Sequence, residues 1–286
     1  MNSVRIITDS GSELSPSEAE GLGVSVLPLR YSIGGTIYRQ DVDISSERLL
    51  ELLAHEKTPA VPMPPAREDI AALLEDVARA GQVALCIHVA DGVVPMAEPL
   101  RSVVQSLFGR ARIEIVDSLA MSYGLKRIVR GAAEVAARGG NLGEVTQAVR
   151  AMISHIYTLF YAEDFEHLEG SVDIQPAQAM LASILGVKPL LMLEEGRLLP
   201  LEKITPRATP VDKLADFVFE FASVAEMAIL LGPREPDFSI EELQLRLTTQ
   251  YPGLEIPLVH YGPLVAATIG PGATGLFVYE GLQAGW

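Results

Sequence analysis

The first half of the chain alternates short apolar runs with longer runs in which apolar residues recur about every three or four positions. The short runs predict buried strands and the longer runs predict amphipathic helices. This alternation favours a parallel sheet with helices on both faces. The strands are predicted at residues 4–7, 24–27, 83–89 and 113–116, and the helices at residues 46–55, 66–80, 100–108 and 122–138, with one more beginning at Ser15.

The second half of the chain has a different order of apolar runs. Residues 194–197 are predicted to form a hairpin turn, and Gly270-Pro271-Gly272 a turn between the last two strands. Residues 59–65 hold four prolines and are predicted to form an extended loop. Strands are predicted at residues 188–193, 198–199, 225–231, 265–269 and 275–279, and helices at residues 177–185, 210–223 and 240–251.

These patterns predict an α/β protein of two domains. We expect residues 1–158 to form an N-terminal domain with a parallel sheet flanked by helices. We expect residues 159–286 to form a second α/β domain with a mixed or antiparallel sheet. Hydrophobic residues make up 49% of the 286 residues, which is enough for a core in each domain.

Composition narrows the possible partners. The net charge of −15 argues against a nucleic-acid partner, because such proteins need a basic surface to neutralise phosphates. No apolar stretch approaches the roughly 20 residues of a membrane span, so membrane insertion is not expected. The chain starts directly with a strand pattern and shows no signal peptide, so we expect a cytoplasmic protein. The single cysteine, Cys86, is predicted to pack inside a strand.

Two Asp-Ser pairs follow predicted strands, where ligands of parallel sheets usually bind. They are Asp9-Ser10 and Asp117-Ser118. One hypothesis is a small hydrolase or transferase, which requires at least two of these side chains to converge within about 4 Å in an open cleft beside a base. The competing interpretation is that they cap the following turns. We predict no metal site and no cofactor, because no histidine pair has ligand spacing and no nucleotide-binding loop is present.

Several short blocks along nearly the whole chain resemble the DegV family of bacterial fatty-acid-binding proteins. This resemblance implies two α/β domains that hold one long-chain fatty acid between them. It also implies a carrier without catalysis of its own, which presents the acid to an ATP-dependent fatty acid kinase. The blocks are Ile6-Ile7-Thr8-Asp9-Ser10, Leu27-Pro28-Leu29, Ile115-Val116-Asp117-Ser118, Leu185-Gly186-Val187-Lys188-Pro189 and Gly270-Pro271-Gly272.

The residues that contact the head group in the family are replaced in this chain. The family's Thr-Ser-Gln-Pro-Ser loop reads Pro62-Met63-Pro64-Pro65-Ala66, and its Leu-Ser-Gly-Thr loop reads Val93-Val94-Pro95-Met96. The histidine before Gly-Pro-Gly reads Thr268. Proline has no backbone N–H, and methionine and valine offer no donor for a carboxylate. Burial of a lipid tail remains favourable, at about 0.8 kcal/mol for each methylene.

Three arrangements of the ligand stay open. Main-chain donors and Thr268 hold the acid, or the head group is protonated or neutral, or apolar side chains close the pocket. For Met180, Leu181 and Ile184, which lie in the helix predicted at residues 177–185, the alternative interpretation is ordinary core packing. The predicted lipid-binding residues are Pro62, Met63, Val94, Pro95, Met96, Thr268 and Gly270, with Met180, Leu181 and Ile184 along the tail.

Two arginines of the family pattern are also replaced, by Asp173 and Thr205, and the alternative for the second is that nearby Arg207 takes its place. Arginine suits a phosphate and a kinase partner, whereas aspartate repels phosphate. We therefore expect weak or absent service to a fatty acid kinase. A second alternative is a degenerate family member that binds no lipid and has a structural or regulatory role.

Overall fold

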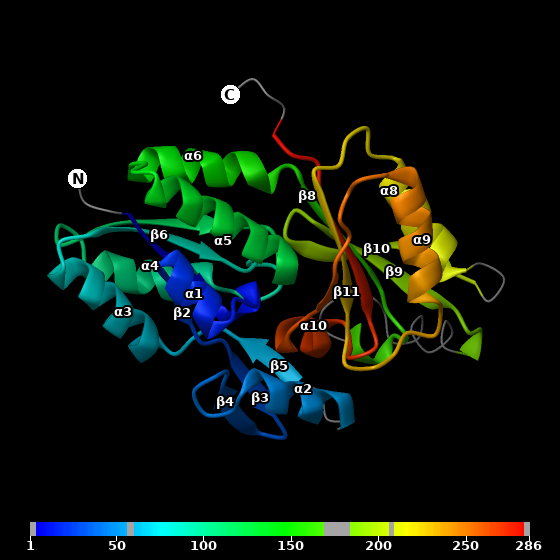
Figure 1. Ribbon diagram of the computed structural model, residues 1–286. Coiled ribbons are helices and arrows are strands. Elements are labelled where there is room, and N and C mark those ends of the chain that lie inside the picture. The colour runs from blue at the N-terminus through cyan, green and yellow to red at the C-terminus, as the bar shows by residue number, and fades with distance from the viewer. Residues whose placement is uncertain (1–3, 56–59, 169–183, 206–208, 283–286) are drawn as a thin grey trace. The chain divides into compact units, whose positions relative to one another are not determined.

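The computed structural model describes residues 4–55, 60–168, 184–205 and 209–282 (Figure 1). The chain divides into two compact units. Unit 1 holds residues 1–49 and 60–154, and unit 2 holds residues 50–59 and 155–286. The boundary at residue 158 remains a prediction about which parts of the chain fold independently.

Unit 1 is built on a four-stranded sheet of order β2-β1-β6-β7, in which all neighbours are parallel. Its central strands bury side chains on both faces, including Ile6, Ile7 and Leu85, as expected for a covered parallel sheet. The strands are β1 (Val4–Asp9), β2 (Val24–Leu27), β6 (Val83–His88) and β7 (Arg112–Asp117).

Five α-helices flank this sheet in the described part of unit 1. Helices α3 and α4 pack against each other and on β6 and β7, whereas α5 and α6 pack together and contact β1 and β6 (Figure 1). Capping boxes at Ser15 and Asn141 begin α1 and α6. The helices are α1 (Pro16–Leu22), α3 (Arg67–Arg79), α4 (Ala97–Ser106), α5 (Ser122–Ala137) and α6 (Leu142–Ile153).

A second, three-stranded antiparallel sheet of order β4-β3-β5 corrects one prediction. It consists of β3 (Arg30–Ile33), β4 (Thr36–Arg39) and β5 (Ala60–Met63), with α2 (Ser46–His55) between β4 and β5. Residues 59–65 were expected to be a loop because of their prolines. Pro62 is compatible with a strand here because β5 lies at the edge of its sheet, where a missing N–H breaks no ladder bond.

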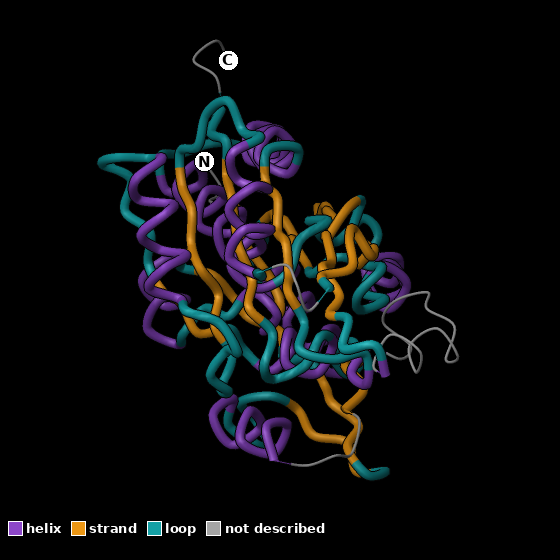
Figure 2. The backbone as a smooth tube through the Cα atoms, turned by 90° about the vertical axis from the view of Figure 1, so that its right-hand side faces the viewer, coloured by secondary structure: helices purple, strands orange, loops and turns teal. Residues whose placement is uncertain are grey.

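Unit 2 contains a six-stranded sheet of order β10-β9-β8-β13-β11-β12 (Figure 2). The sheet is mixed, because β11 and β12 are parallel and the other neighbours are antiparallel. Together with unit 1, this confirms the predicted α/β fold. The strands are β8 (Ile156–Tyr161), β9 (Lys188–Glu194), β10 (Arg197–Ile204), β11 (Glu226–Leu231), β12 (Leu258–His260) and β13 (Thr274–Tyr279).

Helices α8 (Pro210–Phe219) and α9 (Ile240–Gln250) pack together and close the core of unit 2. The β9–β10 turn places Glu195 and Gly196 in the left-handed region, at φ of 46° and 76°, as a two-residue hairpin turn requires. The core takes buried side chains from strands and helices alike: Leu159, Leu190, Leu214, Ile229, Leu243 and Leu276.

The segment before the Gly-Pro-Gly turn also differs from its prediction. Residues 265–269 were expected to be a strand, but they lie mostly in α10 (Pro263–Thr268). A short apolar run has no period that separates a strand from a buried helix, and Pro263 at the first helical position favours the helix. Most of the helix predicted at residues 177–185 lies outside the described residues.

Candidate functional site

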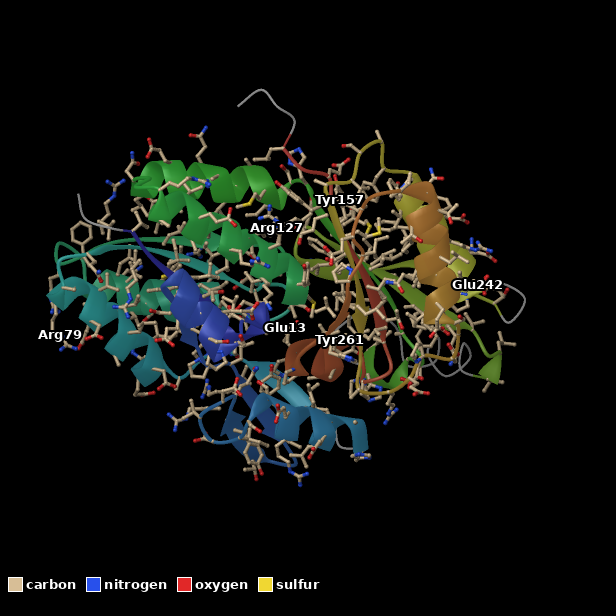
Figure 3. All side chains as sticks on the ribbon, in the orientation of Figure 1. Glu13, Arg79, Arg127, Tyr157, Glu242 and Tyr261 are labelled. Atoms are coloured by element: carbon tan, nitrogen blue, oxygen red, sulfur yellow. The ribbon has the colours of Figure 1, made fainter. Side chains whose placement is uncertain are left out.

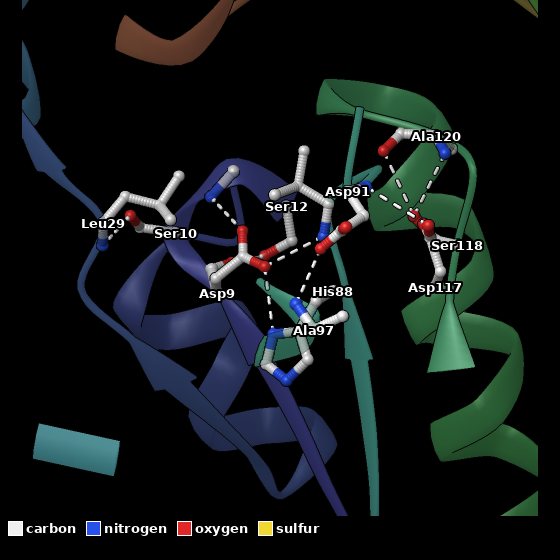
Figure 4. A network of polar contacts seen from close by, with 12 residues as sticks. Asp9, Ser10, Ser12, Leu29, His88, Asp91, Ala97, Asp117, Ser118 and Ala120 are labelled. Atoms are coloured by element: carbon white, nitrogen blue, oxygen red, sulfur yellow. Dashed lines mark hydrogen bonds and ion pairs between the residues drawn. The ribbon is translucent and has the colours of Figure 1, made fainter. Parts of the chain in front are cut away.

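The carboxyl ends of β1, β6 and β7 bring the predicted Asp-Ser pairs to one edge of the parallel sheet (Figure 4). Asp9 is fully buried. Its carboxylate accepts from the backbone N–H of Gly11 at 2.9 Å and of Val89 at 2.9 Å, and lies 3.1 Å from His88 Nδ1. A buried carboxylate needs such donors to offset its lost hydration. Asp9 therefore ties the turn after β1 to the end of β6.

Ser10 is held in a second set of hydrogen bonds. Its Oγ donates to Gln40 Oε1 at 2.8 Å and accepts from the Leu29 backbone N–H at 3.0 Å. The Tyr31 hydroxyl donates to the same Gln40 oxygen at 3.2 Å. Burial, aided by the charges of Asp9 and Glu13, raises the pKa of Tyr31 well above its usual range. The tyrosine therefore stays a donor, and the Ser10 hydroxyl is occupied by structural bonds.

Asp117 and Ser118 also serve the loop that follows their strand. The Asp117 carboxylate accepts from the backbone N–H of Leu119 at 2.9 Å and of Asp91 at 3.2 Å. Ser118 exchanges hydrogen bonds with the backbone of Ala120. Asp91 in turn accepts from the Ala97 N–H at 2.6 Å, at the start of α4.

These contacts match the capping interpretation rather than the arrangement of a nucleophilic site. Asp9 and His88 do meet, but both are buried, and no hydrogen bond among the described residues joins a histidine to Ser10 or Ser118. Burial also raises the pKa of the Cys86 thiol to about 12. The thiol is therefore protonated at neutral pH and is a poor nucleophile.

A second polar cluster surrounds the Gly-Pro-Gly turn of unit 2, which follows α10. His167 and Glu163 come from the segment after β8. A Cβ built on Gly270 would lie 3.1 Å from His167 Nδ1, and one on Gly272 would lie 1.9 Å from Glu163 Oε2. Gly270 also has a φ of +117°, which L side chains rarely adopt. Gly270 is therefore favoured by its backbone conformation, whereas a side chain at position 272 would require the Glu163 carboxylate to move.

Hydrogen bonds to its main-chain carbonyl groups hold this turn in place. The Tyr261 hydroxyl donates to the Gly270 carbonyl at 2.9 Å, and the Arg234 N–H donates to the Pro271 carbonyl at 3.3 Å (Tyr261 is labelled in Figure 3). Thr268 is buried, and its hydroxyl donates to the Leu264 carbonyl at 2.7 Å. A carboxylate bound by Thr268 would have to replace that bond.

The other predicted lipid-binding residues differ in exposure. Pro62 and Met63 are half-buried on β5, Val94 and Met96 are buried, and Pro95 is exposed. Ile184 has 71% of its surface exposed. Met180 and Leu181 lie outside the described residues, as does Asp173, whereas Thr205 is exposed at the end of β10.

Sequence reasoning missed several residues of these clusters, notably His88, Gln40, Asp91 and Glu163. His88 ends an apolar run, a position that suggested only core packing. Its contact with Asp9 follows from the parallel register of β1 and β6, which no local pattern reveals.

No helix within residues 4–55, 60–168, 184–205 and 209–282 is long and apolar enough to cross a membrane. The same ranges contain no group of three or more histidine, cysteine, aspartate or glutamate side chains that could hold a metal ion.

The described residues form an α/β protein with a parallel sheet, a mixed sheet and a small antiparallel sheet, and the two polar clusters lie beside the first two of these. The model of a family described as the uncharacterised DegV family matches residues 3–281, so the chain belongs to the DegV family. A DegV domain-containing protein of Halalkalibacterium halodurans is 26% identical over 98% of this chain and 99% of its own length. One from Streptomyces coelicolor is 27% identical over 96% of this chain and 98% of its own.

Solved structures of the family share the fold. A fatty acid binding DegV family protein of Thermus thermophilus has a TM-score of 0.81 at 23% identity, covering 98% of this chain and 100% of that one. A fatty acid binding DegV family protein of Streptococcus agalactiae has a TM-score of 0.84 at 18% identity, covering 99% of this chain and 100% of that one.

The Asp9 carboxylate is expected to be essential for stability. In Asp9→Asn an amide NH₂ must face at least one of the donors that the carboxylate now accepts from. We expect the free energy of unfolding to fall by about 2–4 kcal/mol, measured by urea denaturation. Asp76→Asn, at an exposed ion pair with Arg79, should change it by less than about 0.5 kcal/mol. Equal effects of the two substitutions would contradict the structural role of Asp9.

We expect a methyl group at position 272 to destabilise the protein, because the Glu163 carboxylate would have to move away from it. Gly272→Ala drives a Cβ into the Glu163 carboxylate and should lower the free energy of unfolding by about 1–3 kcal/mol. Gly21→Ala in α1 is the matched control, because no heavy atom lies within 4 Å of its added Cβ. It should stabilise the protein by about 0.5–1 kcal/mol. Thermal unfolding of both variants measures the contrast.

Proposed function

We propose that this protein binds and carries a long-chain lipid and catalyses no reaction on it. The match to the DegV family over residues 3–281 carries the proposal. Structural relatives described as fatty acid binding cover 98% or more of this chain and support it. The hydrogen bonds of Asp9, Ser10, Asp117 and Ser118 give them structural tasks, which is consistent with a carrier.

The lipid tail needs only apolar surroundings in the protein. Apolar side chains bind a tail through burial alone, at about 0.8 kcal/mol for each methylene, and need no specific donors. We propose that residues of two apolar segments, together with Thr268 and the first glycine of the Gly-Pro-Gly turn, lie near the head group. They are Pro62, Met63, Val94, Pro95, Met96, Thr268 and Gly270, with Met180, Leu181 and Ile184 toward the tail.

We further propose a cytoplasmic location and little or no service to an ATP-dependent fatty acid kinase. Asp173 and Thr205 stand where the family pattern has arginine, so the kinase and its phosphate would lack two cationic partners. A second candidate is a degenerate member that binds no lipid, which the complete burial of Val94 and near-complete burial of Met96 favour.

Native mass spectrometry of the purified protein, followed by denaturation and lipid extraction, tests the carrier function. We expect one long-chain lipid per protein, because a buried tail exchanges slowly with water. An apo mass that does not change after long-chain lipids are added would support the degenerate alternative.

The kinase proposal predicts a gain of function. With a fatty acid kinase that serves other DegV proteins, this protein should yield little acyl phosphate. The double variant Asp173→Arg with Thr205→Arg should raise the yield several-fold, because arginine binds phosphate in a bidentate way. Asp76→Arg adds a cation elsewhere and serves as the control. Efficient acyl phosphate formation by the unaltered protein would refute the proposal.

A further inference from the structure

The loop after β7 in unit 1 holds an apolar side chain on a backbone conformation that does not suit it. Leu119 has a φ of +51°, in the left-handed region that bulky residues rarely adopt. Its side chain is also partly open to solvent, with 39% of its surface exposed. A lone exposed leucine is common on protein surfaces, but one that also takes a left-handed backbone is unfavourable for the fold in two ways.

Hydrogen bonds on both sides of Leu119 hold this conformation. The Leu119 N–H donates to Asp117 Oδ1 at 2.9 Å. On the other side, the Ala120 carbonyl accepts from the Ala90 N–H at 2.9 Å. Strained residues persist only where the surrounding structure determines their conformation, and they cluster at functional sites. The strain at Leu119 is therefore a point at which to look for a ligand contact.

The same bonds link this loop to a predicted lipid-binding segment of unit 1. The Ala90 carbonyl accepts from the N–H groups of Val93 at 2.9 Å and Val94 at 3.0 Å, so the two loops are joined at Ala90. Both loops follow parallel strands at the carboxyl edge of the sheet, where ligands of such sheets usually bind. Val94 is fully buried in its loop, whereas the Leu119 side chain is open to a ligand.

The fold gains little from a leucine at position 119. Glycine adopts a left-handed backbone without strain, and asparagine adopts it more readily than other residues do. The hydrogen bonds given above use backbone atoms of Leu119 and Ala120, so they do not need the leucine side chain. An apolar ligand that covers this side chain would offset the strain, because burial of its exposed area is favourable.

We infer that Leu119 is a lipid-contact residue of unit 1, which packs its side chain against the hydrocarbon chain of the bound lipid. The inference rests on the proposed lipid-binding function and adds a residue that no motif in the sequence indicates. A hydrocarbon chain needs no polar partner, so this contact is independent of the head group. Leu119 therefore contributes to the affinity for long-chain lipids as a class.

Lipid titration of delipidated protein tests this inference. Stearate and octadecanol are added separately, and the bound fraction is measured by native mass spectrometry. Leu119→Asn and Leu119→Gly remove the apolar side chain but suit the left-handed backbone, so both variants should fold. We expect each variant to weaken the binding of either lipid at least about fivefold, because part of the buried apolar area is lost. Leu119→Met keeps an apolar side chain and should stay within about twofold of the unaltered protein.

Phe108→Asn is the matched control for the loss of an exposed apolar side chain. Phe108 has 92% of its surface exposed and precedes β7, so it lies at the opposite end of the strand that Leu119 follows. It should leave both affinities within about twofold. Unchanged affinity in both Leu119→Asn and Leu119→Gly overturns the inference but leaves the carrier function intact, as does an equal loss in Phe108→Asn. Binding of neither lipid by the unaltered protein overturns both the inference and the proposed function.

Discussion

The buried carboxylate of Asp9 is the interaction on which the carboxyl edge of the parallel sheet depends. It joins the turn after β1 to the end of β6 through two backbone N–H groups and His88. A charge in this position is costly unless every oxygen is bonded, so the surrounding backbone has little freedom. The loops that carry Ser10, Asp91 and Ser118 start from this anchored edge, and each is held by bonds of its own.

The Gly-Pro-Gly turn is the corresponding constraint in unit 2. Its main constraint is the backbone of Gly270, whose φ of +117° L side chains rarely adopt, and the His167 ring and the Glu163 carboxylate lie beside the two glycines. The Tyr261 hydroxyl and the Arg234 N–H bind the carbonyl groups of the same turn. A turn packed in this way has little freedom to move.

The bonds that hold both turns are separate from the proposed lipid-binding side chains. The hydrogen bonds that hold the framework use Asp9, Gln40 and backbone groups, and they do not involve the side chains of Met63, Val94 or Met96. Substitutions at the proposed lipid-binding side chains therefore leave these framework bonds in place.

Local sequence determined most of the regular elements and the α/β architecture with a parallel and a mixed sheet, but it did not indicate the small antiparallel sheet of β3, β4 and β5. Apolar period, the capping box at Ser15 and the Glu195-Gly196 turn act over a few residues, so they are legible without a structure. Tertiary structure decided the rest. Residues 60–63 form a strand rather than a loop because they lie at a sheet edge, and residues 265–269 lie mostly in a helix rather than a strand because of how they pack. The Asp9–His88 contact depends on the register of β1 and β6. Such contacts join residues far apart in the chain, and no local pattern encodes which distant partner a side chain meets.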